Sequence, residues 1–152
     1  MHVFSFRAHG VPKPQRRPQA WYNPKTGRAA VYNLKNAEDW KGCVALAAEP
    51  AIRASIAAPL TGPLLVVMTF WFPRPKNHYG TGKNAKTLKA SAPRFPSSKG
   101  KEDIDNVFKP VADVLTVLRA WEDDGQIVSA IIQKHFATDE ERPGCNVEVL
   151  VL

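Results

Sequence analysis

The sequence lacks the features that identify an exported, membrane-spanning or nucleotide-hydrolysing protein. Its two cysteines, Cys43 and Cys145, are far apart and show no metal-ligand spacing, which indicates a reducing compartment. The N-terminal segment is too polar for a signal peptide, and the longest apolar run, PLLVVMTFWFP, is about half as long as a bilayer-spanning helix. No glycine-rich phosphate loop precedes a predicted helix, and the four histidines have no zinc-binding spacing. We therefore expect a soluble, cytoplasmic protein that crosses no membrane and is not an NTPase.

Acidic residues are almost absent from two long segments of the chain. Residues 1–37 contain seven Lys or Arg and no acid, and residues 74–102 contain eight Lys or Arg and one acid. Residues 103–152 reverse this balance, with ten acids and four Lys or Arg. The formal net charge of +7 favours a polyanionic partner, because cations that contact phosphates release condensed counterions. Net charge alone is weak evidence, but its segregation indicates a cationic surface around an acidic site.

The 152 residues suffice for one domain with a buried core, and we predict a single domain over residues 1–152. Apolar runs bounded by turn signals predict strands at residues 2–8, 20–22, 29–32, 64–72, 126–136 and 145–152. The second and third of these flank the turn NPKTG and form a hairpin. The run at 64–72 is continuous rather than alternating, which predicts a buried strand. With two helices, this order predicts an α/β domain with a mixed β-sheet and helices packed on it.

The two helices are predicted from apolar residues at helical spacing. The first runs through AEDWKGCVALAAE with Asn36 as its cap, and Pro50 is expected to break or restart it, with a continuation through AIRASIAA left open. The second is defined by an apolar stripe of Val107, Val111, Val114, Leu115 and Leu118. Pro110 lies inside this stripe, so we expect a kink or an irregular first turn in the second helix.

Residues 73–102 form a long basic loop between a predicted strand and a predicted helix. The segment shows no periodicity, and a loop of this length is usually either functional or disordered. His78, Tyr79 and Phe95 stand among its lysines, a mixture that suits nucleic-acid binding by charge and stacking. A solvated insertion is an equal alternative. The basic, proline-rich segment VPKPQRRP near the N-terminus, here called the arm, supplies the candidate DNA-binding residues Lys13, Arg16 and Arg17. The loop supplies three more candidates, Lys76, Lys99 and Lys101.

The stretch KEDIDNVFKP places two acids at the start of the second helix. If this segment is extended, Asp103 and Asp105 project to one face while Ile104 points into the core. Lys109 follows one turn after Asp105, on about the same side of the helix. A lysine in this position can stabilise charge on a reacting phosphate.

A second acidic pair, Asp123 and Asp124, lies in the turn WEDDG after the helix. The fold must carry this pair back if it is to meet the first pair, and sequence spacing does not establish that meeting. Two or three carboxylates with an open coordination site bind Mg²⁺, which can activate water against a phosphodiester. Each motif alone is weak evidence, because Asp105 can be a helix cap and an Asp-Asp-Gly turn is common.

The segment DIDNVFKPVADVLT followed by AWEDDGQIV resembles the conserved pattern of the RusA family of Holliday-junction resolvases, small DNA endonucleases of bacteria and their prophages. The segments GVPKPQRRPQ and GRAAVYN resemble phage-borne members of that family. The resemblance implies a Mg²⁺-dependent homodimer that cuts two opposed strands of a four-way DNA junction. It assigns metal binding to Asp103, Asp105 and Asp124, and an essential catalytic role to Lys109. Asp113 belongs to the same pattern, and we interpret it as a structural residue that fixes the helix or the dimer.

The leading hypothesis is therefore a structure-selective endodeoxyribonuclease of DNA recombination and repair. Because the basic loop is longer than in the compact members of the family, one alternative is a flap or branched-DNA nuclease of broader specificity. A non-catalytic DNA-binding protein that retains the fold would show steep salt dependence and no metal requirement. The carboxylates together with Lys109 argue against that last alternative.

Overall fold

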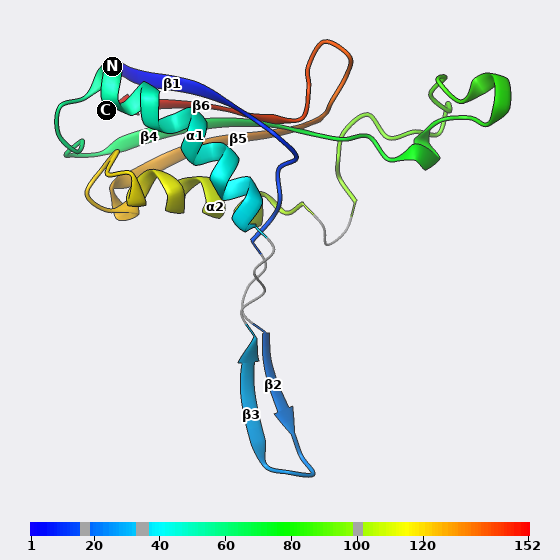
Figure 1. Ribbon diagram of the computed structural model, residues 1–152, viewed down its shortest axis with the longest axis horizontal. Coiled ribbons are helices and arrows are strands. Elements are labelled where there is room, and N and C mark those ends of the chain that lie inside the picture. The colour runs from blue at the N-terminus through cyan, green and yellow to red at the C-terminus, as the bar shows by residue number, and fades with distance from the viewer. Residues whose placement is uncertain (16–18, 33–36, 99–101) are drawn as a thin grey trace.

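Four strands form one mixed sheet in the order β1-β6-β4-β5 (Figure 1). Their bounds are β1 (His2–His9), β4 (Leu64–Phe72), β5 (Ile127–Phe136) and β6 (Gly144–Val151). β4 pairs parallel with β5 and antiparallel with β6, and β6 pairs antiparallel with β1. The computed structural model describes residues 1–15, 19–32, 37–98 and 102–152. The predicted mixed sheet is confirmed.

Helices α1 (Glu38–Ser55) and α2 (Ile104–Val117) cover one face of this sheet (Figure 1). α1 contacts β1 and α2, and α2 also contacts β5. Their buried stripes repeat at helical spacing and close the core: Trp40, Val44, Ala48 and Ile52 from α1, and Val107, Val111, Val114 and Leu115 from α2. The predicted α/β architecture is confirmed. Within the described ranges, no helix is long and apolar enough to span a membrane.

β4 is buried on one face only, although its sequence LLVVMTFWF is almost continuously apolar. The residues that face the helices are buried: Leu64, Val66, Met68, Phe70 and Phe72. The alternate residues are half-exposed: Leu65, Val67, Thr69 and Trp71. The expectation of continuous burial is wrong, because both helices pack on the same face and leave the opposite face of the sheet open.

Both helices extend through an internal proline. α1 runs from Glu38 to Ser55 through Pro50, so the expected break there is wrong. Pro50 is exposed, and water can therefore bind the carbonyl of Leu46 that the missing N–H leaves without a helical partner. The expected cap, Asn36, lies outside the described residues, and Ala37 occupies the N-cap position. α2 likewise continues through Pro110, which is buried.

The predicted hairpin is confirmed as β2 (Gln19–Asn23) paired antiparallel with β3 (Arg28–Tyr32). Its turn is closed by Asn23, whose carbonyl accepts the N–H of Gly27 at 2.8 Å and whose side-chain Oδ1 accepts the N–H of Lys25 at 2.9 Å. Gly27 has a φ of 65°, a left-handed conformation that favours glycine. The hairpin projects away from the sheet and the helices (Figure 1).

The long loop has a defined backbone over the described residues 73–98. It contains two short 3-10 turns, η1 (Lys76–His78) and η2 (Gly82–Asn84). The N–H of Gly80 donates to the carbonyl of Thr87 at 3.0 Å, which joins the outgoing and returning arms of the loop. The loop extends beyond the ends of β4 and β5 (Figure 1).

Arg74 fastens the base of this loop to the sheet. Its guanidinium donates to the carbonyl of Pro93 at 2.8 Å and lies 4.2 Å from the centre of the Phe136 ring. His78 packs edge-on against the same ring, with the ring centroids 5.4 Å apart. The loop is therefore tied at its base to the C-terminal end of β5.

Candidate active site

The first acidic pair lies at the N-terminal end of α2. The helix begins at Ile104, with Asp103 at its N-cap position and Asp105 in its first turn. Ile104 is 47% exposed, so the expectation that it anchors this segment in the core is wrong. The segment is not extended, because the helix already begins at Ile104 and Asp105 follows helical geometry. Both acids are exposed at the helix end whose dipole favours negative charge.

The carboxylate of Asp103 does not cap the helix at whose start it lies. An N-cap Asp normally accepts a hydrogen bond from the second or third N–H of its helix. Asp103 forms no such side-chain bond, and only its backbone carbonyl accepts, from the N–H groups of Asn106 (3.0 Å) and Val107 (3.1 Å). Within the described part of the chain, the carboxylate has no hydrogen-bond or ion-pair partner, which leaves it available to a ligand.

Lys134 fixes the backbone immediately before Asp103. It lies on β5 opposite Phe70 of β4, whose side chain faces the helices, so Lys134 points to the same face of the sheet. Its partly buried ammonium donates to the carbonyl of Glu102 at 2.5 Å. Sequence reasoning missed Lys134. The available signal was a cation at a core-facing position of an otherwise largely apolar strand.

Lys109 is held by an acid on its own helix. Its Nζ donates to Oδ1 of Asp113 at 3.1 Å, one turn further along α2. The second carboxylate oxygen of Asp113 lies 3.7 Å from Nζ of Lys41 on α1. Asp113 therefore links the two helices and orients Lys109 at once, which agrees with its interpretation as a structural residue.

The N-terminal arm is attached to α2 through a hydrogen bond that Pro110 makes possible. Pro110 has no N–H to offer the carbonyl of Asn106, four residues earlier. That carbonyl accepts the backbone N–H of Gln15 at 2.8 Å instead. Lys13, two residues back along the arm, lies with its Nζ 3.7 Å from a carboxylate oxygen of Asp39 on α1. The arm thus passes directly beside the first acidic pair.

The second acidic pair lies beyond the other end of α2, at the short turn η3 (Asp124–Gln126). Oδ1 of Asp123 accepts the N–H of Gly125 at 2.7 Å, and the Gln126 side chain accepts the N–H of Asp123 at 3.0 Å. Asp123 is therefore occupied in a capping box. Asp124 is exposed, and its carboxylate has no hydrogen bond or ion pair to any described residue.

A single chain does not bring the two acidic pairs together. α2 has 14 residues, so its ends are about 21 Å apart at 1.5 Å per residue. Asp103 precedes this helix and Asp124 follows it, and β5 begins at the far end (Figure 1). Among the residues described, no three His, Cys, Asp or Glu side chains are close enough together to hold a metal ion. Asp103 and Asp105 offer the hard oxygen donors that suit Mg²⁺, which often takes one or two carboxylates together with water and substrate phosphates.

Cationic segments gather at the Asp103 end of α2. The arm, the projecting hairpin and the long loop all leave the domain at this end (Figure 1). Residues 73–98 of the loop carry six Lys or Arg and no acid, and Lys76 lies in η1. The other candidate DNA-binding residues lie outside the described residues: Arg16, Arg17, Lys99 and Lys101.

The buried cysteine, Cys145, offers no alternative chemistry. Both Cys43 and Cys145 are free thiols. Burial raises the pKa of the Cys145 thiol far above its usual range, so it stays protonated and unreactive at neutral pH. The exposed carboxylates remain the best candidates for chemistry.

Exposed carboxylates at a helix end, a nearby lysine and surrounding basic segments are typical of a metal-dependent nuclease that acts on DNA. The protein-family model described as Endodeoxyribonuclease RusA matches residues 9–150. Because this match covers nearly the whole chain, the chain belongs to the RusA family of endodeoxyribonucleases. It is a Holliday-junction resolvase of that family, a phosphodiester hydrolase, and nucleases of the family are metal-dependent and act on branched DNA. A search of the curated proteins gave no match. The resemblance noted from the sequence is confirmed.

Proposed function

We propose that the chain resolves four-way DNA junctions as a homodimer, and that each Mg²⁺ site is completed across the two-fold axis. One copy supplies Asp103 and Asp105, and the other copy supplies Asp124. The observation that carries this proposal is the length of α2, which separates the two acidic groups of one chain by about 21 Å. A single chain therefore offers half of a site at each end of this helix.

A two-fold axis can unite these halves. In a symmetric dimer the same surface contacts itself, so a residue i that meets residue j is matched by j meeting i. If α2 lies antiparallel to the α2 of the second copy, the N-terminal end of each helix meets the C-terminal end of the other. The dimer then holds two sites, roughly one helix length apart. Two sites related by symmetry match the two opposed strands that a four-way junction presents.

Exposed apolar side chains at the C-terminal end of α2 and the start of β5 support such a dimer. Val117, the last residue of the helix, is 80% exposed. Val128, near the second pair, is 63% exposed on β5. Among the described strands, β5 pairs with β4 alone, so its other edge has no partner. Burial of these side chains against a second copy would remove apolar surface from water.

The roles of the side chains follow from their chemistry. Asp103, Asp105 and Asp124 hold the metal through hard carboxylate oxygens, and Mg²⁺ bound there would activate a water and shield the departing oxygen. Lys109 follows Asp105 by one turn of α2, and its ammonium, which now donates to Asp113 at 3.1 Å, is the cation that would stabilise charge on the reacting phosphate.

The basic segments supply binding energy by contacting the DNA phosphates. Lys13 on the arm and Lys76 on the loop are the described candidates. We extend the same role to Arg16, Arg17, Lys99 and Lys101 from the sequence. These cations bring a polyanion to an acidic site that would otherwise repel it.

The test is cleavage of a four-way junction, a flap and a duplex, each with and without Mg²⁺. We expect Mg²⁺-dependent paired cuts in the junction, and loss of cleavage with retained or stronger junction binding in Asp103→Asn and Asp124→Asn. Asp139→Asn, an exposed acid in the turn between β5 and β6, is the matched control and keeps wild-type cleavage. Normal cleavage by both site variants would contradict the assignment, and preferential cutting of the flap would favour the broader specificity.

A further inference from the structure

Five side chains form a continuous row across the open face of the sheet, away from both helices. Trp71 of β4 and His135 of β5 are paired in register, and their rings stack with centroids 6.1 Å apart and planes inclined by 27°. The guanidinium of Arg7, on β1, lies 4.1 Å from the centre of the Trp71 ring. At the other end, Phe95 of the long loop lies 5.8 Å from His135, and Arg94 lies 5.2 Å from the Phe95 ring.

A glycine in the sheet leaves space for the Arg7 side chain. Gly144 on β6 is the register partner of Trp71, and it has no side chain to fill the space between β1 and β4. A Cβ atom at Gly144 would lie 3.3 Å from Nε of Arg7 and only 2.2 Å from the carbonyl oxygen of Ala8. A side chain at Gly144 would therefore clash with the backbone of β1 and crowd the Arg7 side chain.

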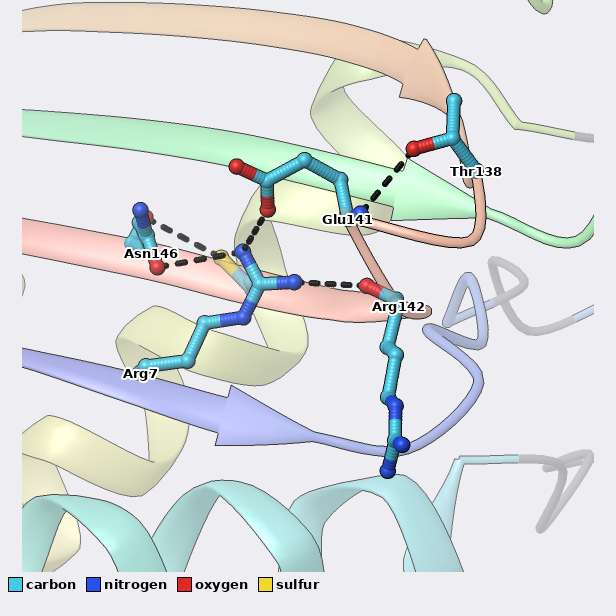
Figure 2. A network of polar contacts seen from close by, with 6 residues as sticks. Arg7, Thr138, Glu141, Arg142 and Asn146 are labelled. Carbon is cyan, nitrogen blue, oxygen red and sulfur yellow. Dashed lines mark hydrogen bonds and ion pairs between the residues drawn. The ribbon is translucent and has the colours of Figure 1, made fainter.

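Polar contacts hold the Arg7 guanidinium in place (Figure 2). Arg7 donates to Oδ1 of Asn146 at 3.2 Å and to the backbone carbonyl of Arg142 at 2.5 Å. A carboxylate oxygen of Glu141 lies 3.6 Å from the same guanidinium. The row is therefore a fixed platform that begins and ends with a cation.

We propose that an unpaired stretch of DNA strand stacks its bases on this row, which we call the aromatic row (Arg7, Trp71, His135, Phe95 and Arg94). This inference rests on the branched-DNA function, because a strand opened near the branch point exposes bases that a duplex hides. Aromatic side chains stack on any base without sequence preference, and Arg94, 5.2 Å from the Phe95 ring, adds a cation that can meet a phosphate. Loop residues 73–98 carry six Lys or Arg and no acid, so the Phe95 end of the row favours a polyanion, whereas Arg7 at the opposite end already pairs with Glu141.

The aromatic row lies close to the first acidic pair in the fold. His135 stands between Lys134, whose ammonium bonds the carbonyl of Glu102, and Phe136. Consecutive residues of a strand point to opposite faces, so the row and Asp103 flank the same end of β5 from its two sides. Phe95 is 46% exposed and is the aromatic ring of the row that is most open to a base. A strand that leaves the acidic site around this end of the sheet therefore meets Phe95.

The test is binding of a single-stranded oligonucleotide and of a duplex of equal length, without divalent metal. We expect Phe95→Ala to weaken single-strand binding roughly 5- to 100-fold, the loss of one stacked base, with little effect on the duplex. Phe95→Tyr keeps the ring and restores binding. Leu88→Ala, which truncates a 48% exposed apolar residue of the same loop outside the row, is the control and binds as the wild type does.

A second measurement reads the stacking directly. Base stacking quenches tryptophan fluorescence, so the oligonucleotide should quench the wild type more than it quenches Trp71→Phe, which keeps an aromatic ring in the row. The proposal is overturned if Phe95→Ala matches the Leu88→Ala control, if it weakens single-strand and duplex binding equally, or if Trp71→Phe leaves the quenching unchanged. Asp103→Asn is expected to retain single-strand binding, so failure of the catalytic assignment and failure of the aromatic row are separable.

Discussion

Replacement of Lys134 by Met should displace the first acidic pair while leaving its carboxylates chemically intact. Met is unbranched and similar in shape to the stem of Lys, but it cannot donate to the Glu102 carbonyl that Lys134 now bonds at 2.5 Å. Loss of a hydrogen bond to a charged group costs about 1.5–3 kcal/mol of unfolding free energy. For a chain of this size, this corresponds to a fall in Tm of roughly 3–12 °C. Because the bond fixes the residue before Asp103, we also expect the cleavage rate to fall about 10- to 100-fold through misplacement of the carboxylate.

Thermal unfolding, junction binding and single-turnover cleavage together measure these effects. Junction affinity should change little in Lys134→Met, and Lys134→Arg should recover part of the rate, because it keeps the charge and the donors. Arg53→Met removes a cation from an exposed ion pair with Glu49 at the far end of α1, and it should cost less than about 1 kcal/mol without slowing cleavage. Cleavage at the wild-type rate by Lys134→Met, despite a lowered Tm, would refute a positioning role and leave Lys134 a residue of stability alone.

Two further predictions use unfolding measurements. Gln15→Pro removes the backbone N–H that donates to the Asn106 carbonyl and should lower the free energy of unfolding by about 1–3 kcal/mol. In a Pro110→Ala background, the N–H of Ala at position 110 can donate to the same carbonyl, so the penalty should disappear. An equal penalty in both backgrounds would contradict the link between the arm and Pro110. Asp123→Ala breaks the capping box of η3 and should lower the free energy of unfolding by about 0.5–2 kcal/mol, while Asp124→Ala should leave it nearly unchanged. Equal losses in the two variants would mean that both acids are structural.

The order of elements and the α/β architecture could be predicted from the sequence because local signals determine them. Apolar periodicity located α2, and the NPKTG turn located the hairpin. The burial of β4 could not be predicted, since LLVVMTFWF fits a strand covered on both faces or on one. Which face of the sheet is covered depends on where both helices pack, and the sequence of β4 alone does not determine that.

At the candidate site, the expected side-chain directions are wrong because they require residues 103–105 to be extended, whereas α2 already begins at Ile104. An extended segment would have buried Ile104, whereas a helix that begins at Ile104 exposes it. The separation of Asp124 from Asp103 was foreseeable, because a predicted helix of this length already spans about 20 Å. The bond from Lys134 to Glu102 joins residues 32 positions apart, and no local pattern announces such a contact.

The most direct test of a shared metal site is complementation between two inactive variants. Asp103→Asn and Asp124→Asn chains carrying different affinity tags are co-expressed, and the mixed dimer is purified through both tags. If each site takes Asp103 from one copy and Asp124 from the other, the mixed dimer contains one intact site and one site with both changes. It should then nick one strand of a four-way junction at about half the wild-type rate of strand cleavage. A mixed dimer as inactive as either variant alone would show that each site lies within one chain, and would contradict the account.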